Sequence, residues 1–201
     1  MCFKKRCAKI LCGEFETFLT QRPGREKTKL KEFIMKKRSL TLYLTRGAAV
    51  SALYVALTFI SSLVGLSSGV IQLRLSEALC ILPLFLPEAI PGLFVGCMIA
   101  NLVSGAVFWD IIFGSLATLI GAVGARLLRR LPERLKWLAT LPTVVSNSLI
   151  VPPVLIYAYG VPEGYLFITV TVAVGEILSA SLFGSLLYYK IKKSDLIKRI
   201  G

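Results

Sequence analysis

Long apolar stretches alternate with short polar or basic segments from about residue 44 onward, whereas the first 40 residues mix charge with scattered apolar positions. An α-helix rises about 1.5 Å per residue, so crossing a hydrocarbon core of about 30 Å takes roughly 20 residues. The pattern predicts an all-α bundle of six transmembrane helices. Their approximate bounds are 44–66, 76–86, 89–104, 107–128, 137–159 and 165–189.

The second and third of these spans are the least regular. Pro83, Pro87 and Pro91 interrupt the apolar run, which is long enough for one kinked helix or two short ones. With two helices, 23 of the 24 Lys and Arg residues fall on one side of the membrane and Arg74 alone lies outside. Five spans would divide the basic segments between both sides. The positive-inside rule therefore predicts six spans with both termini in the cytoplasm.

Composition supports lipid as the solvent. The chain is 55% hydrophobic and 17% charged, whereas soluble domains carry about 25% charged residues. A net charge of +13 would suggest nucleic acid in a soluble protein, but here the basic residues flank the spans. We expect a multi-pass protein of the cell membrane, of bacterial type, that binds no nucleic acid.

The predicted membrane domain covers residues 41–195 and lies between a basic cytoplasmic tail, 1–40, and a short one, 196–201. The first tail lacks the pattern of a signal peptide, and we expect it to be disordered or loosely helical. Met35 begins a stretch that looks like a natural start, so residues 1–34 are expected to be an upstream misreading of the gene. The intact mass of the natively expressed protein tests this expectation.

Several catalytic systems are excluded by residue content. The chain has no histidine, which excludes an HExxH zinc site and any nucleophile that depends on histidine. It has no Walker A motif, so any ATP must be used by another chain. The five cysteines form no CxxC pair and are interpreted as small hydrophobic residues. We expect a protein that is not an enzyme and has no metal and no cofactor of its own.

Two polar residues lie deep in the last two predicted spans. A charge in mid-membrane costs at least about 2.5–3.5 kcal/mol, so it usually faces a cavity or a partner. Glu176 and Asn147 each lie about ten residues into adjacent antiparallel spans, which places them at similar depth. One interpretation is a structural hydrogen bond between two helices, and the other is contact with a ligand.

A second polar group is expected near the outer face. Arg74 and Glu77 share one helix face at the start of the second span, where they form either a local ion pair or part of a binding site. Trp109 and Asp110 open the fourth span, where a carboxylate is also favoured by the helix dipole. Asn101 lies near the outer end of the third span. All five are candidate substrate-binding residues.

Small residues recur every four positions in two spans. Ala48, Ala52 and Ala56 form one such ridge in the first span, and Gly92, Gly96 and Ala100 form another in the third. Ridges of this kind let helices approach closely, either within one chain or with a partner.

The segments QLRLSEALCILP, EAIPGLFVGCMIANLVSG and WDIIFGSLATLIGA resemble the QueT family of substrate-binding S components, which belong to energy-coupling factor importers and are associated with queuosine precursors. The resemblance covers residues 45–190, the whole membrane region. It implies a complex with a transmembrane coupling subunit and two ATPase subunits that use ATP. It also implies that Ala48, Ala52 and Ala56 contact the coupling subunit.

The candidate residues suit a 7-deazaguanine base. Such a base presents two parallel donors, which one carboxylate accepts at once, and an oxygen that Asn147 or Arg74 could bind. A cationic aminomethyl group would suit Asp110 and the face of Trp109. Other small polar heterocycles would fit too. The alternatives are an S component or solo carrier for another vitamin-like or nucleobase-like compound, a membrane-embedded enzyme, and a purely structural subunit.

Overall fold

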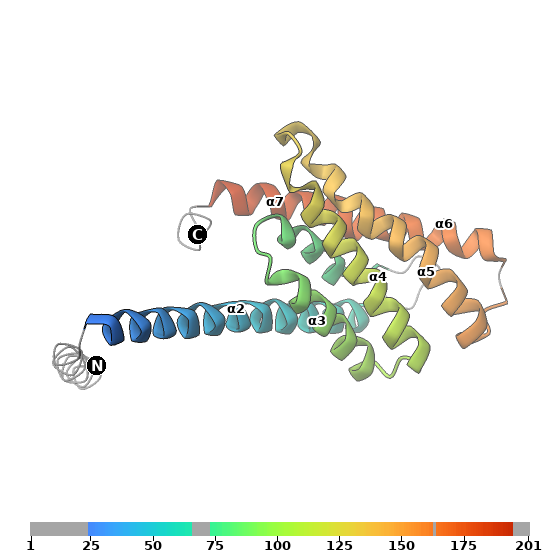
Figure 1. Ribbon diagram of the computed structural model, residues 1–201. Coiled ribbons are helices and arrows are strands. Elements are labelled where there is room, and N and C mark those ends of the chain that lie inside the picture. The colour runs from blue at the N-terminus through green and yellow to red at the C-terminus, as the bar shows by residue number, and fades with distance from the viewer. Residues whose placement is uncertain (1–23, 66–72, 163, 195–201) are drawn as a thin grey trace. The chain divides into compact units, whose positions relative to one another are not determined.

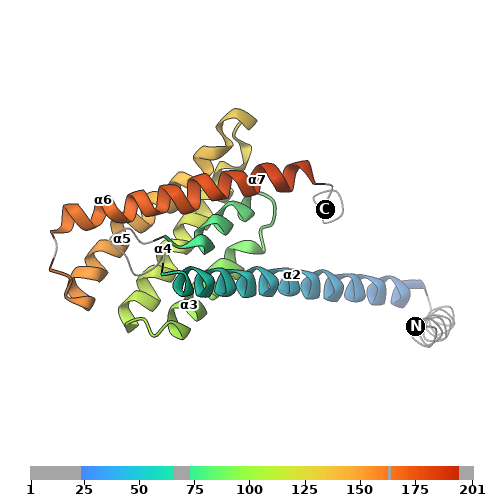
Figure 2. The same cartoon turned by 180° about the vertical axis from the view of Figure 1, so that it is seen from behind.

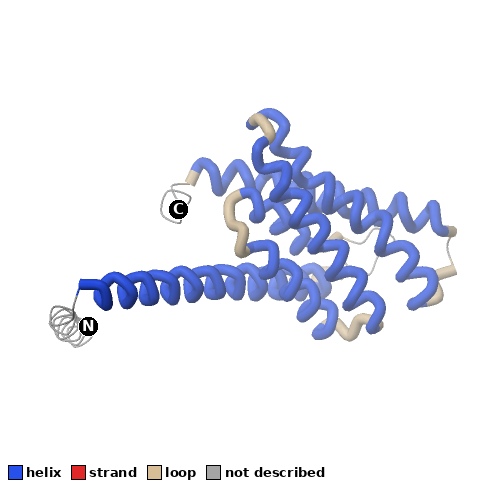
Figure 3. The backbone as a smooth tube through the Cα atoms, viewed as in Figure 1, coloured by secondary structure: helices blue, strands red, loops and turns tan. Residues whose placement is uncertain are grey.

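The computed structural model describes residues 24–65, 73–162 and 164–194, and every regular element within them is a helix. Figure 3 shows these helices joined by short loops. The all-α class is therefore confirmed. In chain order the elements are α2 (Gly24–Leu63), η1 (Leu75–Leu84), α3 (Ala89–Val103), α4 (Phe108–Leu127), η2 (Leu128–Arg130), η3 (Glu133–Thr140), α5 (Leu141–Tyr159), α6 (Tyr165–Glu176), η4 (Ile177–Phe183) and α7 (Gly184–Lys193).

The chain divides into two compact units, residues 1–43 and residues 44–201. Within the first unit, the predicted basic tail is helical from residue 24 onward. Residues 1–23 and the predicted tail 196–201 lie outside the described residues. The second unit holds all the candidate site residues.

Four helical segments in the described part of the chain are long and apolar enough to cross a membrane. They are Ser39–Leu63, Phe108–Arg130, Glu133–Tyr159 and Tyr165–Lys193. These segments correspond to the first, fourth, fifth and sixth predicted spans. Their lengths of 23 to 29 residues suit a hydrocarbon core of about 30 Å.

The proline-interrupted run forms two helices, as predicted, instead of one kinked helix. η1 is a 3-10 helix of 10 residues and α3 is an α-helix of 15 residues. Both are shorter than the roughly 20 residues that a helix needs to cross a bilayer alone. The described residues therefore contain four full-length candidate spans, judged by length and composition, and the six-span arrangement stays a prediction.

The short helix η1 lies inside the bundle. Its residues 76–83 are all buried, and it packs against α4 on one side and against η4 and α7 on the other. Figures 1 and 2 show this green segment between α4 and the rod formed by α6 and α7. A helix that is apolar all round is expected to be buried, and η1 carries the polar residue Glu77 into that interior.

Glycine lets two helix pairs approach closely. A Cβ atom on Gly92 of α3 would lie 2.5 Å from the carbonyl oxygen of Gly47 in α2. A Cβ atom on Gly121 of α4 would lie 2.7 Å from the Cα atom of Thr143 in α5, and α4 and α5 run side by side in Figure 1. For these glycines, the small residues serve packing within the chain.

Large apolar side chains cover the outside of the second unit. Leu53 and Phe59 of α2, Leu116 of α4, Leu149 of α5 and Leu166 of α6 are each at least 40% exposed. A soluble monomer rarely exposes so many large apolar side chains, whereas lipid tails solvate them well. The polar side chains, by contrast, gather in the interior.

Candidate functional site

A small polar cavity lies where η1, α4, α5 and α6 meet. Its volume is about 20 Å³. Four of the seven predicted substrate-binding residues line it. The full lining is Arg74, Glu77, Gly114, Thr118, Asn147, Val151, Val172 and Glu176.

Glu176 and Asn147 meet at this cavity, as their predicted depth indicated. Glu176 is the last residue of α6, just where the chain changes to the π-helical segment η4. Such π-turns inside helices are frequent at functional sites. The side chain is 7% exposed, and its Oε2 atom has no hydrogen-bond partner among the described residues. Asn147 of α5 lines the same cavity as this free acceptor.

Glu77 presents a second carboxyl group to the cavity, and it is held from both sides. It is 2% exposed. The Tyr54 hydroxyl of α2 donates a hydrogen bond to its Oε1 atom, and the Cys80 thiol lies 3.2 Å from its Oε2 atom. Arg74 forms its ion pair with Asp110 and not with Glu77, so the local Arg74–Glu77 ion pair that the sequence left open is not formed.

Arg74 directly precedes η1, and its side chain is held by residues of α3 and α4. One guanidinium nitrogen donates to Asn101 Oδ1 at 3.3 Å, and another lies 3.9 Å from Asp110 Oδ2. Asp110 is 5% exposed and also accepts a hydrogen bond of 3.1 Å from the Tyr159 hydroxyl. Asn101 and Asp110 therefore lie behind Arg74 and position it, while Arg74 itself lines the cavity.

Trp109 lies away from the other predicted residues. It is 55% exposed, stacks on Phe113, and lines an apolar groove with α5 on the outside of the bundle. The cavity itself thus combines two carboxyl groups with one guanidinium, an amide and a hydroxyl. In the described part of the chain, no group of three His, Cys, Asp or Glu side chains could hold a metal ion.

Thr118 and Tyr54 belong to the site but were missed by sequence reasoning. Thr118 lines the cavity and is 1% exposed, with its hydroxyl bonded to the Gly114 carbonyl oxygen at 3.1 Å. Tyr54 stands behind Glu77. The available signal was a hydroxyl in the middle of an apolar span. For Thr118 this signal is weak because Thr and Ser often satisfy their bonds within one helix.

The cavity is closed in this structure. A volume of about 20 Å³ holds a single water molecule, whereas small-molecule pockets measure about 300–1,000 Å³. A ligand larger than water must therefore separate some of the four elements before it reaches Glu176. The residues already point into a shared space, so binding needs an opening and not a new set of side chains.

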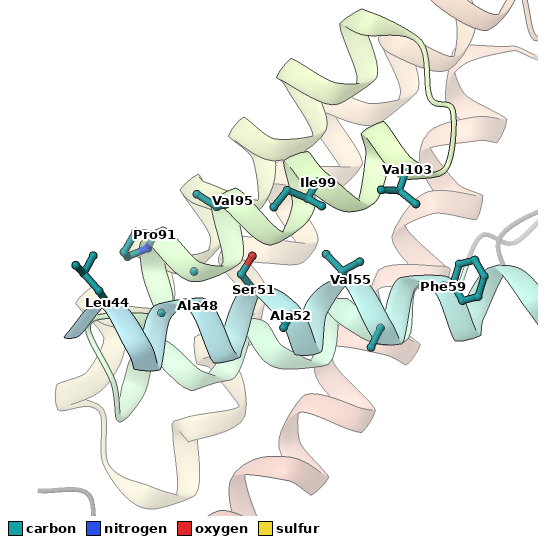
Figure 4. A pocket seen from close by; sticks show the side chains of 13 residues that line it. Leu44, Ala48, Ser51, Ala52, Val55, Phe59, Pro91, Val95, Ile99 and Val103 are labelled. Atoms are coloured by element: carbon teal, nitrogen blue, oxygen red, sulfur yellow. The ribbon is translucent and has the colours of Figure 1, made fainter. Parts of the chain in front are cut away.

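A separate groove of about 900 Å³ runs between α2 and α3 on the outside of the bundle. Ala48, Ala52 and Ala56 line it from α2, and all three are exposed. Figure 4 shows Val95 and Ile99 along the α3 side of the same groove. No other described helix therefore packs over the predicted alanine ridge, whereas Gly92 of the α3 ridge lies against Gly47 of α2.

Comparison with known proteins places this arrangement in context. The family model described as "QueT transporter" matches residues 44–193. A "Queuosine precursor transporter QueT" from Lactococcus lactis subsp. cremoris (strain MG1363) is 38% identical over 102 residues, which is 50% of this chain and 60% of that relative. The chain thus spans less than two thirds of the relative's length. No solved structure matches significantly.

Proposed function

The chain belongs to the QueT transporter family, and on that premise we propose that it is a membrane substrate-binding subunit of an energy-coupling factor importer. It captures a queuosine precursor, a 7-deazaguanine base, from outside the cell. The family match covers residues 44–193. It therefore includes the whole of three full-length spans and all of the first, Ser39–Leu63, except its first five residues. The protein is a multi-pass transporter and not an enzyme.

The free acceptor at Glu176 carries the proposal. A buried polar atom without a partner is costly, so it marks a place where a ligand atom is expected. The 7-deazaguanine base presents a ring N–H and an exocyclic amine side by side. One carboxylate accepts both in a fork, and such charge-assisted bonds are about twice as strong as neutral ones. Asn147 and Arg74 are then the donors for the oxygen of the base.

The remaining carboxyl group suits a cationic substituent. Asp110 is engaged by Arg74 and Tyr159, and Trp109 lies outside the bundle, so neither is free to meet an aminomethyl group in the cavity. Glu77 lines the cavity and offers the second negative charge. We therefore assign the base to Glu176 and the substituent to the Glu77 side of the cavity.

The energy for uptake comes from partner chains. The sequence carries no nucleotide-binding motif and needs no cofactor of its own, so ATP is bound by two ATPase subunits that act through a transmembrane coupling subunit. The groove between α2 and α3 receives the coupling subunit, because its small exposed alanines allow a partner helix to approach closely.

The topology of this subunit follows from charge. We place the chain in a bacterial cell membrane with both termini on the cytoplasmic side. The short helices η1 and α3 then form the second and third crossings. Arg74 then lies on the outer side, where the precursor enters.

Reconstitution into liposomes tests the importer. The purified chain is combined with a coupling subunit and ATPases, and uptake of a radiolabelled aminomethyl-7-deazaguanine is measured with and without ATP. We expect uptake only when all subunits and ATP are present. Uptake by the chain alone would instead establish a solo carrier, and absence of uptake by a complete, ATP-hydrolysing complex would contradict the proposal.

The docking groove is tested in the same assay. Ala52→Trp fills the groove, and we expect it to abolish co-purification with the coupling subunit and ATP-driven uptake. Ala49→Trp is the matched control, because Ala49 is exposed on the same helix but does not line the groove. Equal loss in both variants would contradict this choice of surface.

A further inference from the structure

Tyr54 occupies an unusual position for an aromatic residue in a membrane helix. It lies near the middle of the Ser39–Leu63 span, far from the interfaces where tyrosine is enriched, and it is 1% exposed. It belongs to the inward face of α2, with Ser51 and Thr58 one turn away on either side. A buried tyrosine hydroxyl needs a partner, and the choice of partner is informative.

That partner is Glu77, across the interface between α2 and η1. The Tyr54 hydroxyl donates to Glu77 Oε1, while the Cys80 thiol takes Oε2. Thr58 and Ser61, on the same face, donate to backbone carbonyl oxygens of their own helix, at 3.0 and 2.9 Å, and Ser61 also accepts a hydrogen bond from the Leu75 N–H at 3.0 Å. Of these three hydroxyl groups on α2, only that of Tyr54 donates to a residue that lines the cavity.

This bond fixes a side chain that would otherwise have several rotamers. A thiol is a weak donor, so the phenol is the stronger of the two groups that hold the Glu77 carboxyl. A ligand that meets a preset carboxyl avoids the entropy of ordering it, which is the usual source of affinity from preorganisation. The carboxyl oxygen keeps a second lone pair, so Tyr54 and a ligand can be bound together.

We propose that Tyr54 is a positioning residue of the substrate site: its hydroxyl holds the Glu77 carboxyl at the wall of the cavity and so sets the affinity for a donor-bearing or cationic ligand that Tyr54 itself does not touch. The inference rests on the proposed function for the identity of that ligand. It rests on the α2–η1 contact for the role of Tyr54.

Calorimetry with aminomethyl-7-deazaguanine tests the role on the full chain in detergent. Tyr54→Phe removes the hydroxyl and keeps the ring, and we expect affinity to fall about ten- to a hundredfold, as for loss of a hydrogen bond to a charged group. Thr58→Val, the matched control, removes a buried hydroxyl from the same helix face and is expected to leave affinity unchanged.

The decisive comparison measures the effect of Tyr54→Phe on affinity in a protein that already carries Glu77→Gln. If Tyr54 acts through Glu77, adding Tyr54→Phe to Glu77→Gln produces little further loss of affinity. A tyrosine that merely supports packing would cost the same in both backgrounds, and that result would overturn the proposal. Equal affinity of wild type and Tyr54→Phe would overturn it as well.

A double-mutant cycle on thermal stability, measured without ligand, keeps this test separate from the proposed function. If wild type binds no 7-deazaguanine, the assigned substrate is wrong, and the Tyr54–Glu77 bond is then judged from the Tm values of the same four proteins. We expect the double variant to lose clearly less Tm than the two single losses added together. Additive losses would show that Tyr54 does not hold Glu77, whatever the substrate is.

Discussion

The ion pairs of this molecule differ strongly in the solvent exposure of their side chains. The Glu133–Lys192 ion pair is short, at 2.7 Å, but its side chains are 57% and 49% exposed. The Asp110–Arg74 pair is longer, at 3.9 Å, but its side chains are only 7% and 25% exposed. Exposed pairs contribute about 0–1 kcal/mol, whereas losing one partner of a buried pair costs more because a charge is left uncompensated. Burial therefore outweighs distance here.

This difference leads to a prediction about stability. Asp110→Asn removes the charge next to Arg74 and weakens the bond from Tyr159, so we expect the free energy of unfolding to fall by about 1–3 kcal/mol. Glu133→Gln is the control at the exposed pair and should cost less than about 1 kcal/mol. Chemical unfolding in detergent measures both. A larger loss for Glu133→Gln than for Asp110→Asn would contradict the role given to burial.

The sequence predicted the proximity of some cavity-lining residues because of their chemistry. Glu176 and Asn147 stand out in apolar runs, and equal depth in antiparallel neighbours was enough to bring them together. Trp109 was associated with the site because it adjoins Asp110. Successive residues on a helix point about 100° apart, however, so Asp110 faces inward while Trp109 faces out. Tyr54 was missed because its contact with Glu77 depends on tertiary packing between α2 and η1.

At the scale of elements, helix starts were easier to predict than helix type. The third and sixth predicted spans begin at residues 89 and 165, as α3 and α6 do, because polar or proline-rich segments precede both. Hydropathy could not distinguish a 3-10 helix from an α-helix at η1, nor the π-helical segment inside the last span. These choices depend on which backbone carbonyl each N–H reaches, and side-chain polarity carries little information about that.

The close approach of α2 and α3 gives a prediction at this scale. Gly92→Ala would place a Cβ atom 2.5 Å from the Gly47 carbonyl oxygen, which is backbone and cannot rotate away. We expect a loss of about 1–3 kcal/mol in the free energy of unfolding, as for other overpacked sites.

Gly164→Ala is the matched control for that substitution. A Cβ atom there meets nothing within 4 Å, and the backbone φ of −64° suits alanine. It should leave the free energy of unfolding within about 0.5 kcal/mol of wild type. If Gly92→Ala were equally silent, the two helices would not be held together by this contact.

For the molecule as a whole, the two faces of α2 have different tasks. The inward face meets η1 through Tyr54 and Glu77, and the outward face lines the groove proposed for the coupling subunit. The substrate cavity is interior and closed, with about 20 Å³ of space. In the proposed function, capture of a base requires the helices around the cavity to separate, and closing again would bury the polar groups of the base against Glu176, Asn147 and Arg74.

The most direct test of this account is calorimetry of 7-deazaguanine precursors with wild type, Glu176→Gln, and Glu133→Gln as a control outside the cavity. We predict tight binding by wild type and the control, and loss of about a hundredfold in Glu176→Gln, because the amide cannot accept both donors of the base. A 7-deazaadenine, which lacks that donor pair, should bind far more weakly to wild type. Unchanged affinity in Glu176→Gln, or no binding by folded wild type, would contradict the assignment of Glu176 as the group that grips a queuosine precursor.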